Sequence, residues 1–376
     1  MKKTPRKRHG GKKTTFLYRE IANHIEKQIG DGVYQPHDRL PSMDDLAAQF
    51  QANKLTVFKA IKDLVQRGIV YTEPARGTFV APSLPAIHHH GGTRSYSGKE
   101  IQRIGVLSRV MVPHDTGHFH RELMEALRSN ASQQGISLSL IPASGKSLSE
   151  ILTLLHNEQI HALMCIGPFP RYEIIEITRA ISPCVLIDHH EPGLAVDAIC
   201  QDNFGGAYQA IEYLIAKGFT SVAFVKGEEE QVASQERLAG AIQAWVDAGR
   251  PKYTLETHPG NFREDGGYEA TRNLIEQKKV TFPGAIFYAN DEMAMGGLNY
   301  LHQQGIEIPG QIAVIGFDDI PLASQSVINL TTVRAPISQM AELACKRLTA
   351  PRTPDSPNYS ITFLGSNLII RGTTPA

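Results

Sequence analysis

The sequence predicts an α/β protein with a small winged helix-turn-helix head and a larger pair of doubly wound α/β subdomains. Residues 42–80 have the pattern of two short helices followed by a β-hairpin, and basic residues concentrate in the first 80 positions. From residue 101 onward, short apolar strands alternate with amphipathic helices. At 376 residues the chain is too long for one compact domain and suits a head joined to a two-part module.

Residues 1–13 form a basic tail that we predict to be disordered. The tail contains seven Lys or Arg and no acidic residue, a composition suited to lying along DNA phosphates, although a solubilising role alone is the alternative. The whole chain balances 38 basic against 38 acidic residues, but residues 1–80 hold 15 basic and 8 acidic ones. The head therefore carries a net charge of +7 and the remainder −7.

A helix-turn-helix is predicted between Ser42 and Gly68. Ser42 and Asp45 have the spacing of a capping box, which begins the first helix, and Gly68 ends the second. Residues 53–64 form the predicted recognition helix. The two helices bury a shared core across the turn at residues 51–53, through apolar residues at helical spacing: Leu46, Phe50, Val57, Ile61 and Leu64 or Val65.

A β-hairpin follows the second helix and completes the winged motif. Residues 69–71 and 78–80 are short β-rich runs, and Pro74, Arg76 and Gly77 lie in the turn between them. The tip of this wing therefore carries a cation. We predict that residues 14–81 form the DNA-binding domain.

Residues 82–100 are a predicted linker, because they lack apolar periodicity and contain Pro, Gly and Ser. Three consecutive histidines occupy residues 88–90. Histidine-rich tracts can bind metal, but on a linker we expect no metal function from them.

Residues 16–81 resemble the DNA-binding head of the GntR family of bacterial regulators. The resemblance rests on ordered motifs: LYREI at 17–21, DRLPS at 38–42, TV at 56–57 with AI at 60–61, and RGTFV at 76–80. It implies that the recognition helix, the wing and the residues beside them contact double-stranded DNA. The candidate DNA-binding residues are Arg39, Ser42, Lys54, Thr56, Phe58, Lys59, Arg76 and Gly77.

Phe58 departs from this family, which usually has arginine after the Thr-Val pair. A phenyl ring cannot make the bidentate contact to guanine that arginine makes. Two alternatives remain open: Lys59 substitutes for the arginine, or Phe58 touches a thymine methyl group.

The region after residue 101 contains two series of apolar strands. The alternation of strands and helices begins again after Gln201. The predicted strands are residues 104–107, 138–141, 162–166 and 185–187 in the first series, and 222–225, 285–288 and 312–317 in the second. Two such series predict two doubly wound subdomains with a cleft between them.

Polar residues follow several of these strands, at the sheet edge where open parallel sheets bind ligands. Asp188, Asn290, Asp291, Asp318 and Asp319 are placed there. Carboxylates and an amide can bond to the hydroxyl groups of a sugar, but each residue could instead cap the next helix. We expect ligand binding from Asp188, Asn290 and Asp318, and capping from Asp291 and Asp319.

Residues 101–372 resemble the effector domain of the LacI family, which is itself similar to periplasmic sugar-binding proteins. The motifs are QDNFGGA at 201–207, RLAG at 237–240, NDEMAMG at 290–296, IPG at 308–310, GFDDI at 316–320, LTTVRAP at 330–336 and LIIRGTT at 368–374. The resemblance implies that Arg237, Asn290 and Asp318 contact effector. By weaker alignment Asp188, Phe119, His120 and Phe262 also line the cleft, and Arg109 could pair with a ligand or be solvated.

The usual LacI-type head and hinge helix are absent, so coupling between ligand and DNA is expected to run through the linker and the dimer geometry. The combined architecture resembles arabinose-repressor-type regulators, which join a GntR-type head to a LacI-type sensor. Residues 101–376 are then a periplasmic-binding-protein-like effector and dimerisation domain. We therefore expect a homodimeric repressor of carbohydrate genes, with a sugar-like effector and a palindromic operator.

Other classes of protein fit less well. The four cysteines are widely separated, no 18-residue apolar stretch exists, and no signal peptide follows the basic tail, which favours a cytoplasmic protein without membrane contact. We expect no cofactor and no catalysis. Residues 144–147 lack the first glycine of a phosphate-binding loop. The alternatives are an enzyme with a cleft, and a metal-dependent sensor using His114, His118, His120 and Glu122.

Overall fold

The computed structural model describes most of the chain, which forms two compact units. It covers residues 13–30, 33–66, 69–73, 76–81, 101–110, 117–229, 231–251, 254–325, 327, 329–350 and 359–376. One unit comprises residues 1–95 with 146–153 and 169–180, and the other comprises 96–145, 154–168 and 181–376. Most of the basic tail, the linker with its histidines, Gly68, Pro74 and His114 lie outside the described residues.

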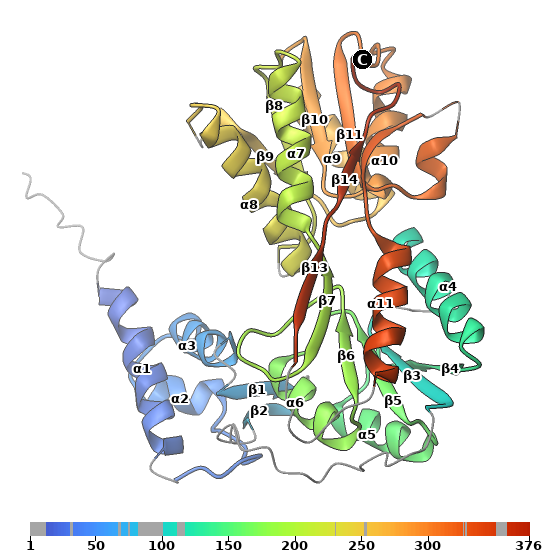
Figure 1. Cartoon of the computed structure of the whole chain (residues 1–376). Coiled ribbons are helices and arrows are strands. Elements are labelled where there is room, and N and C mark those ends of the chain that lie inside the picture. The colour runs from blue at the N-terminus through green and yellow to red at the C-terminus, as the bar shows by residue number, and fades with distance from the viewer. Residues whose placement is uncertain are drawn as a thin grey trace, which may run out of the picture. The chain divides into compact units, whose positions relative to one another are not determined.

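The head has the predicted winged helix-turn-helix fold (Figure 1). Its elements are α1 (Lys13–Gly30), α2 (Met43–Gln49), α3 (Lys54–Gln66), β1 (Val70–Glu73) and β2 (Gly77–Val80). The capping box is confirmed: the Ser42 hydroxyl accepts from the Asp45 amide at 3.2 Å, and the Asp45 carboxylate accepts from the Ser42 amide at 3.2 Å. Strands β1 and β2 pair antiparallel, with Tyr71 opposite Phe79.

The hydrophobic core of the head is formed by residues from its helices and from the two strands of the wing. Leu46, Val57 and Leu64 are buried as the spacing predicts, whereas Val65 is exposed, so Leu64 is the core residue of that pair. Helix α1, which the sequence analysis did not predict, adds Ile21 and Ile25 to the same cluster. Burial of this shared apolar face fixes the orientation of α3 within the head.

The first lobe of the effector domain contains a parallel sheet in the order β13-β7-β6-β5-β3-β4. Its strands are β3 (Arg103–Ser108), β4 (Ser137–Pro142), β5 (Ala162–Ile166), β6 (Cys184–Ile187), β7 (Asp197–Gln201) and β13 (Ile361–Leu364). Helices α5 (Leu148–Asn157) and α6 (Arg171–Ala180) lie between strands in sequence. Helices α4 (His118–Gln133) and α11 (Ile337–Thr349) pack side by side in one apolar cluster with the sheet (Figure 1).

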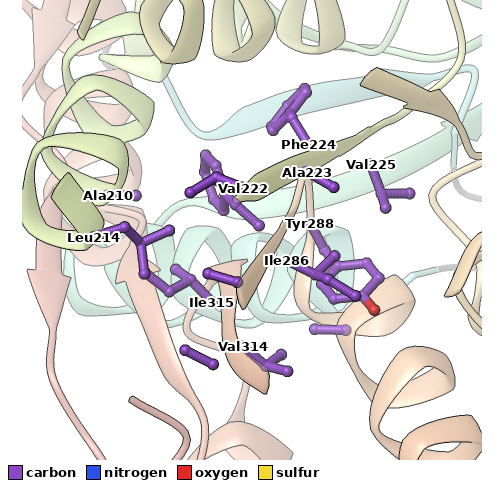
Figure 2. Packing of buried hydrophobic residues seen from close by; sticks show 14 of the residues in the cluster. Ala210, Leu214, Val222, Ala223, Phe224, Val225, Ile286, Tyr288, Val314 and Ile315 are labelled. Carbon is purple, nitrogen blue, oxygen red and sulfur yellow. The ribbon is translucent and has the colours of Figure 1, made fainter. Parts of the chain in front are cut away.

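The second lobe has a sheet in the order β14-β12-β11-β10-β8-β9, parallel except that β14 pairs antiparallel with β12. Its strands are β8 (Val222–Lys226), β9 (Glu256–Pro259), β10 (Gly284–Tyr288), β11 (Ile312–Asp318), β12 (Thr331–Arg334) and β14 (Asn367–Ile369), and its helices are α7 (Asn203–Ala216), α8 (Val232–Asp247), α9 (Glu264–Glu276) and α10 (Asp291–Gln303). Figure 2 shows its core, where Ala210 and Leu214 of α7 lie beside the apolar residues of β8, β10 and β11. The central strand β10 is buried throughout, as expected for a sheet covered on both faces.

The chain passes repeatedly between the two lobes. It crosses between β7 and α7, between β12 and α11, and again between β13 and β14, which Figure 1 shows as one long segment linking both sheets. The two predicted strand series are confirmed, each in its own sheet, but the return of α11 and β13 to the first lobe was not predicted. The doubly wound pair itself is confirmed.

Two further expectations concern composition. All four of the widely separated cysteines are free and buried. Within the described part of the chain, no helix has both the length and the apolar character needed to cross a membrane.

Candidate effector site and DNA-binding surface

The effector domain holds a buried arginine at the point where its lobes meet. The Arg237 side chain, on α8, donates from Nε to Asn203 Oδ1 at 2.8 Å and from Nη1 to the Ala289 carbonyl. Its guanidinium lies over the Phe317 ring, 3.8 Å from the centroid, and Nη2 is 3.2 Å from Asp318 Oδ1. These partners fix the guanidinium plane, so Arg237 presents a preorganised charge.

Two features of the local sequence place Arg237 there. Asn203 begins α7, directly after the capping residue Asp202, whose carboxylate accepts from the Gly205 amide at 2.7 Å. Gly240, one helical turn after Arg237, allows α8 to approach α7, because a Cβ at this glycine would lie 2.1 Å from the Phe204 carbonyl oxygen. Asn203 was not predicted as a site residue, although it lies within the LacI-type motif at residues 201–207.

Asp318 ends β11 beside the arginine. It is only 7% exposed, and burial raises its pKa to about 7, with the charges of Asp188 and Glu292 acting in the same direction and Arg237 opposing them. Asp318 also lines a cavity of about 440 Å³ whose other walls come from α4, the start of α11, Asp319 and Arg334. The carboxyl group is therefore placed to accept hydrogen bonds from a polar ligand.

Asp188 faces the same guanidinium from the first lobe, at the end of β6. Its Oδ1 accepts from Gln201 Nε2 at 3.2 Å. Burial raises its pKa to about 6, and the charge of Arg237 opposes the rise. Because Asp188 and Arg237 belong to different lobes, this polar cluster spans the cleft that the sequence predicted.

Backbone strain concentrates around this cluster. Asp188, Phe262, Asp318 and Asp319 have φ values of 63°, 61°, 110° and 58°, in a region that side chains other than glycine rarely adopt. Each such residue costs on the order of 1–3 kcal/mol, and such residues cluster at functional sites. Strain at Asp188 and Asp318, the two carboxylates beside Arg237, supports the assignment of this cluster as a binding site.

The helix caps differ from the expectation. Asn290 is the N-cap of α10: its Oδ1 accepts from the Met293 amide at 3.0 Å, and its Nδ2 donates to the Phe262 carbonyl at 2.9 Å. Asn290 therefore positions Phe262, and any contact with effector stays a prediction.

The prediction that Asp291 and Asp319 are helix caps was wrong. Asp291 is fully buried and accepts from the Ile320 amide at 2.9 Å and from the Thr332 hydroxyl at 2.5 Å. Asp319 pairs with Arg334 at 2.6 Å and with Arg371 at 2.7 Å. Both carboxylates tie the segment after β11 to its neighbours, and each of their four oxygens has a hydrogen-bond or ion-pair partner.

The N-terminus of α4 brings further predicted residues to the cleft. Burial lowers the pKa of His120 to about 4; the charge of Glu292 opposes this shift and the charge of Arg237 adds to it. His120 is therefore a neutral imidazole near the cluster. Nearby, Glu292 Oε1 accepts from the His118 amide at 2.8 Å and lies 3.0 Å from His118 Nδ1, joining the two lobes. Glu292 was not among the predicted site residues.

The remaining predicted residues have other surroundings. Phe119 is buried within the first-lobe core, edge-on to His120. The Phe262 ring packs over Gly227, where a Cβ would lie 2.0 Å from it. Arg109 follows β3, its amide bonds to the Ile166 carbonyl at 3.1 Å, and its side chain is partly buried. A role for each in effector binding stays a prediction.

The described residues contain no group of three or more His, Cys, Asp or Glu side chains that could hold a metal ion. Of the histidines considered for a metal, His118 pairs with Glu292 and His120 lies in the cleft, while His114 is outside the described residues.

The outward face of α3 carries three of the eight predicted DNA-binding residues. Lys54, Phe58 and Lys59 are exposed on it. Thr56 is only 2% exposed, and its hydroxyl donates to Asn53 Oδ1 at 2.8 Å, which also accepts from the Thr56 amide at 2.8 Å. In this geometry Thr56 fixes the start of the recognition helix and does not face outward.

The wing and the start of α2 supply the other candidates. Gly77 has φ of 125°, and a Cβ there would lie 2.8 Å from Arg39 Nε, so glycine lets the Arg39 guanidinium pack against the wing. Arg76 is exposed and pairs with Glu73 at 2.6 Å. Ser42 is held in its capping box. DNA contacts from these residues stay predictions.

Replacing Lys54 by alanine is expected to weaken operator binding by about 1–3 kcal/mol if the ammonium group reads a base edge. Lys54 pairs with Asp44 at 2.6 Å, but both side chains are largely exposed, so the fold should lose little. Affinity would be measured by fluorescence anisotropy on a duplex enriched from a random pool, with the exposed Lys27 of α1 replaced as a charge-matched control. Equal losses in both variants would remove Lys54 from the recognition surface.

The comparisons with known proteins agree with this geometry. Residues 17–80 match the gntR family of bacterial regulatory proteins, and residues 211–374 match the periplasmic binding protein-like domain. The ribose operon repressor of Escherichia coli (strain K12) is 30% identical over 256 residues, 67% of this chain and 76% of that protein. The transcriptional repressor PurR of Vibrio campbellii is 29% identical over 288 residues, 74% of this chain and 83% of that protein.

A solved structure is similar to the effector domain. The structure of a LacI family transcriptional regulator from Enterococcus faecium, with bound ribose, matches with a TM-score of 0.64 and 25% identity, over 73% of this chain and 98% of that chain.

The winged head and the two-lobed domain with its interlobe polar cluster define a ligand-responsive, DNA-binding transcription regulator. The chain belongs to the LacI family of transcriptional regulators through its effector domain, and its head is of the GntR type.

Proposed function

We propose that the chain is a repressor of carbohydrate-metabolism genes, whose effector is a small sugar bound between the lobes at Asp188, Arg237 and Asp318. The observation that carries the proposal is the contact between Arg237 and Asp318, which lies in a buried cluster drawn from both lobes. Carboxylates and a guanidinium together accept and donate hydrogen bonds to vicinal hydroxyl groups. A relative named for the ribose operon and a similar structure with bound ribose support the class of ligand.

The charge of the cluster favours a neutral sugar over a sugar phosphate. Asp318 and Asp188 carry their charges beside the Arg237 guanidinium, and burial together with the charges of Asp188 and Glu292 raises the pKa of Asp318. A phosphate group would add negative charge to a site where carboxylates already repel one another.

A thermal-shift screen of the full chain tests this proposal. Pentoses, hexoses and their phosphates are compared, because a ligand that binds only the folded state stabilises it by RT ln(1 + [L]/Kd). Stabilisation by a neutral pentose or hexose, absent with its phosphate, is the expected result. Stabilisation by the phosphates alone would contradict the proposed site.

We further propose that the chain works by binding and not by catalysis, as a cytoplasmic homodimer on a palindromic operator. The Arg237 guanidinium is engaged by fixed protein partners, which suits a sensor, and the relatives are named as repressors. Two heads on one duplex would each place α3 in the major groove of one half-site. Sedimentation of the protein with a selected duplex tests the stoichiometry of two chains per duplex.

Deleting residues 2–13 is expected to weaken specific and non-specific DNA binding similarly and to make the salt dependence shallower. The reason is that seven cations of the tail would neutralise phosphates without reading sequence. If all seven contact phosphates, the slope of log K against log salt decreases by about 6 per head. A chain of equal length with these cations replaced by glutamine is the control, and an unchanged slope in both would show that the tail does not touch DNA.

A further inference from the structure

The outward face of α3 holds two large apolar side chains. Leu55 is 64% exposed and Phe58 is 48% exposed, whereas the inner residues of the same helix, Val57, Ala60 and Leu64, are buried. Residues three positions apart are neighbours on a helix surface, so Leu55 and Phe58 form one apolar ridge. A folded head gains nothing from leaving this ridge in water, which points to a partner that covers it.

The charges beside the ridge identify the chemistry of that partner. Lys54, Lys59 and Lys62 are exposed on the same face of α3, on both sides of Leu55 and Phe58. This face therefore fits a surface that is strongly negative and carries apolar groups between its charges. The major groove of DNA has this character, because its phosphates flank base edges on which thymine presents a methyl group.

We propose that Leu55 and Phe58 recognise thymine methyl groups in the major groove of the operator. This inference rests on the DNA-binding function of the head and adds the base pair that α3 reads. Three residues of helix rise about 4.5 Å, and successive bases on one strand rise about 3.4 Å, so the ridge matches methyl groups on adjoining base pairs. Each operator half-site should then contain adjoining T·A pairs.

The exposure of Phe58 favours the second of the two alternatives that its sequence position left open, a contact with a thymine methyl group. A contact from Lys59 to guanine does not cover the ridge, because an ammonium group donates hydrogen bonds and buries little apolar surface. A methyl contact covers it and uses the side chain that replaces the arginine of the GntR family. Lys59 and Lys62 then supply phosphate or base-edge contacts around this central ridge.

Deoxyuridine tests the proposal, because it differs from thymidine only by the missing C5 methyl group. A duplex is first enriched on the full chain from a random pool, and each thymidine in the half-site is then replaced singly by deoxyuridine. Affinity is measured by fluorescence anisotropy at one fixed salt concentration. At one or more positions the wild type is expected to bind about 4-fold more weakly for each contacted methyl group that is removed.

Variants then assign the effect to the ridge. Phe58→Ala and Leu55→Ala should each bind more weakly and lose the preference for thymidine over deoxyuridine at one position. Lys62→Ala, on the same face, is the matched control and should weaken both duplexes equally while keeping the preference. Thermal unfolding checks each fold, and little change is expected because both ridge side chains are exposed.

Equal affinity of the wild type for thymidine and deoxyuridine at every position would overturn the proposal while leaving DNA binding intact. The same conclusion would follow if Phe58→Ala and Leu55→Ala kept the full preference. If the wild type enriched no duplex at all, the DNA-binding function itself would fail, and this inference with it.

Discussion

Replacing Arg237 by alanine is expected to abolish the response to effector and to destabilise the effector domain by about 3–5 kcal/mol. The guanidinium is buried, so its removal leaves Asn203 Oδ1 and the Ala289 carbonyl without this donor and Asp318 without its ion-pair partner. Urea unfolding measures the stability. Operator binding with and without the sugar found by the thermal-shift screen measures the response.

A second variant separates loss of function from loss of fold. Arg237→Lys keeps a positive charge near Asp318 but cannot reproduce the planar fork that reaches several acceptors. We expect it to fold, to bind operator and to respond only at much higher sugar concentration. The matched control is Arg250→Lys, which changes another arginine of the same lobe that donates to the Phe219 carbonyl and stacks on Trp245. A normal sugar response in Arg237→Lys would remove the guanidinium from the binding site.

The fold of the chain was largely predictable from its apolar periodicity, and its connections were not. Strands such as residues 162–166 and 312–317 are continuous apolar runs because they are buried on both faces, and the structure confirms them as β5 and β11. Strands β9 and β13 are four residues long and partly exposed, so they leave no such run. The return of α11 and β13 to the first lobe depends on tertiary pairing, which periodicity does not encode.

The candidate site was predictable as a set of positions but not as a set of contacts. The place of Asp188 and Asp318 at strand ends predicted the sheet edge at which the structure brings both carboxylates near Arg237. Which oxygen caps a helix is decided by geometry: Asn290 caps α10, while its neighbour Asp291 turns inward to Thr332 and Ile320. Glu292 could not be predicted as a site residue, because its partner His118 lies on the other lobe and no local sequence pattern indicates that contact.

Asp318→Asn is expected to remove a pH dependence from the stability of the effector domain. Burial raises the pKa of Asp318 from 3.8 to about 7, so the folded state holds a proton that the unfolded chain releases. The stability that this group contributes is therefore fully present below pH 3.8 and is lost as the pH rises through about 7. From about pH 5 to about pH 7, wild type should lose roughly 2–3 kcal/mol relative to the variant.

The same ionisation predicts how sugar affinity depends on pH in the wild type. A sugar hydroxyl donates its hydrogen bond to the ionised carboxylate, and a group with a pKa of about 7 changes from mostly protonated to mostly ionised between about pH 6 and about pH 8. Affinity should therefore increase by up to about 10-fold over this interval, measured by calorimetry with the most stabilising sugar of the screen.

Asp318→Asn should bind the sugar weakly and with little dependence on pH, because an amide does not titrate in this range. Asp247→Asn, which alters an exposed carboxylate on α8, is the matched control and should retain the wild-type dependence. Asp188, whose pKa burial raises to about 6, is already half ionised at the start of the interval, so it adds at most about a 2-fold change. A wild-type affinity that is equal at about pH 6 and about pH 8 would show that the Asp318 carboxylate does not bind the sugar.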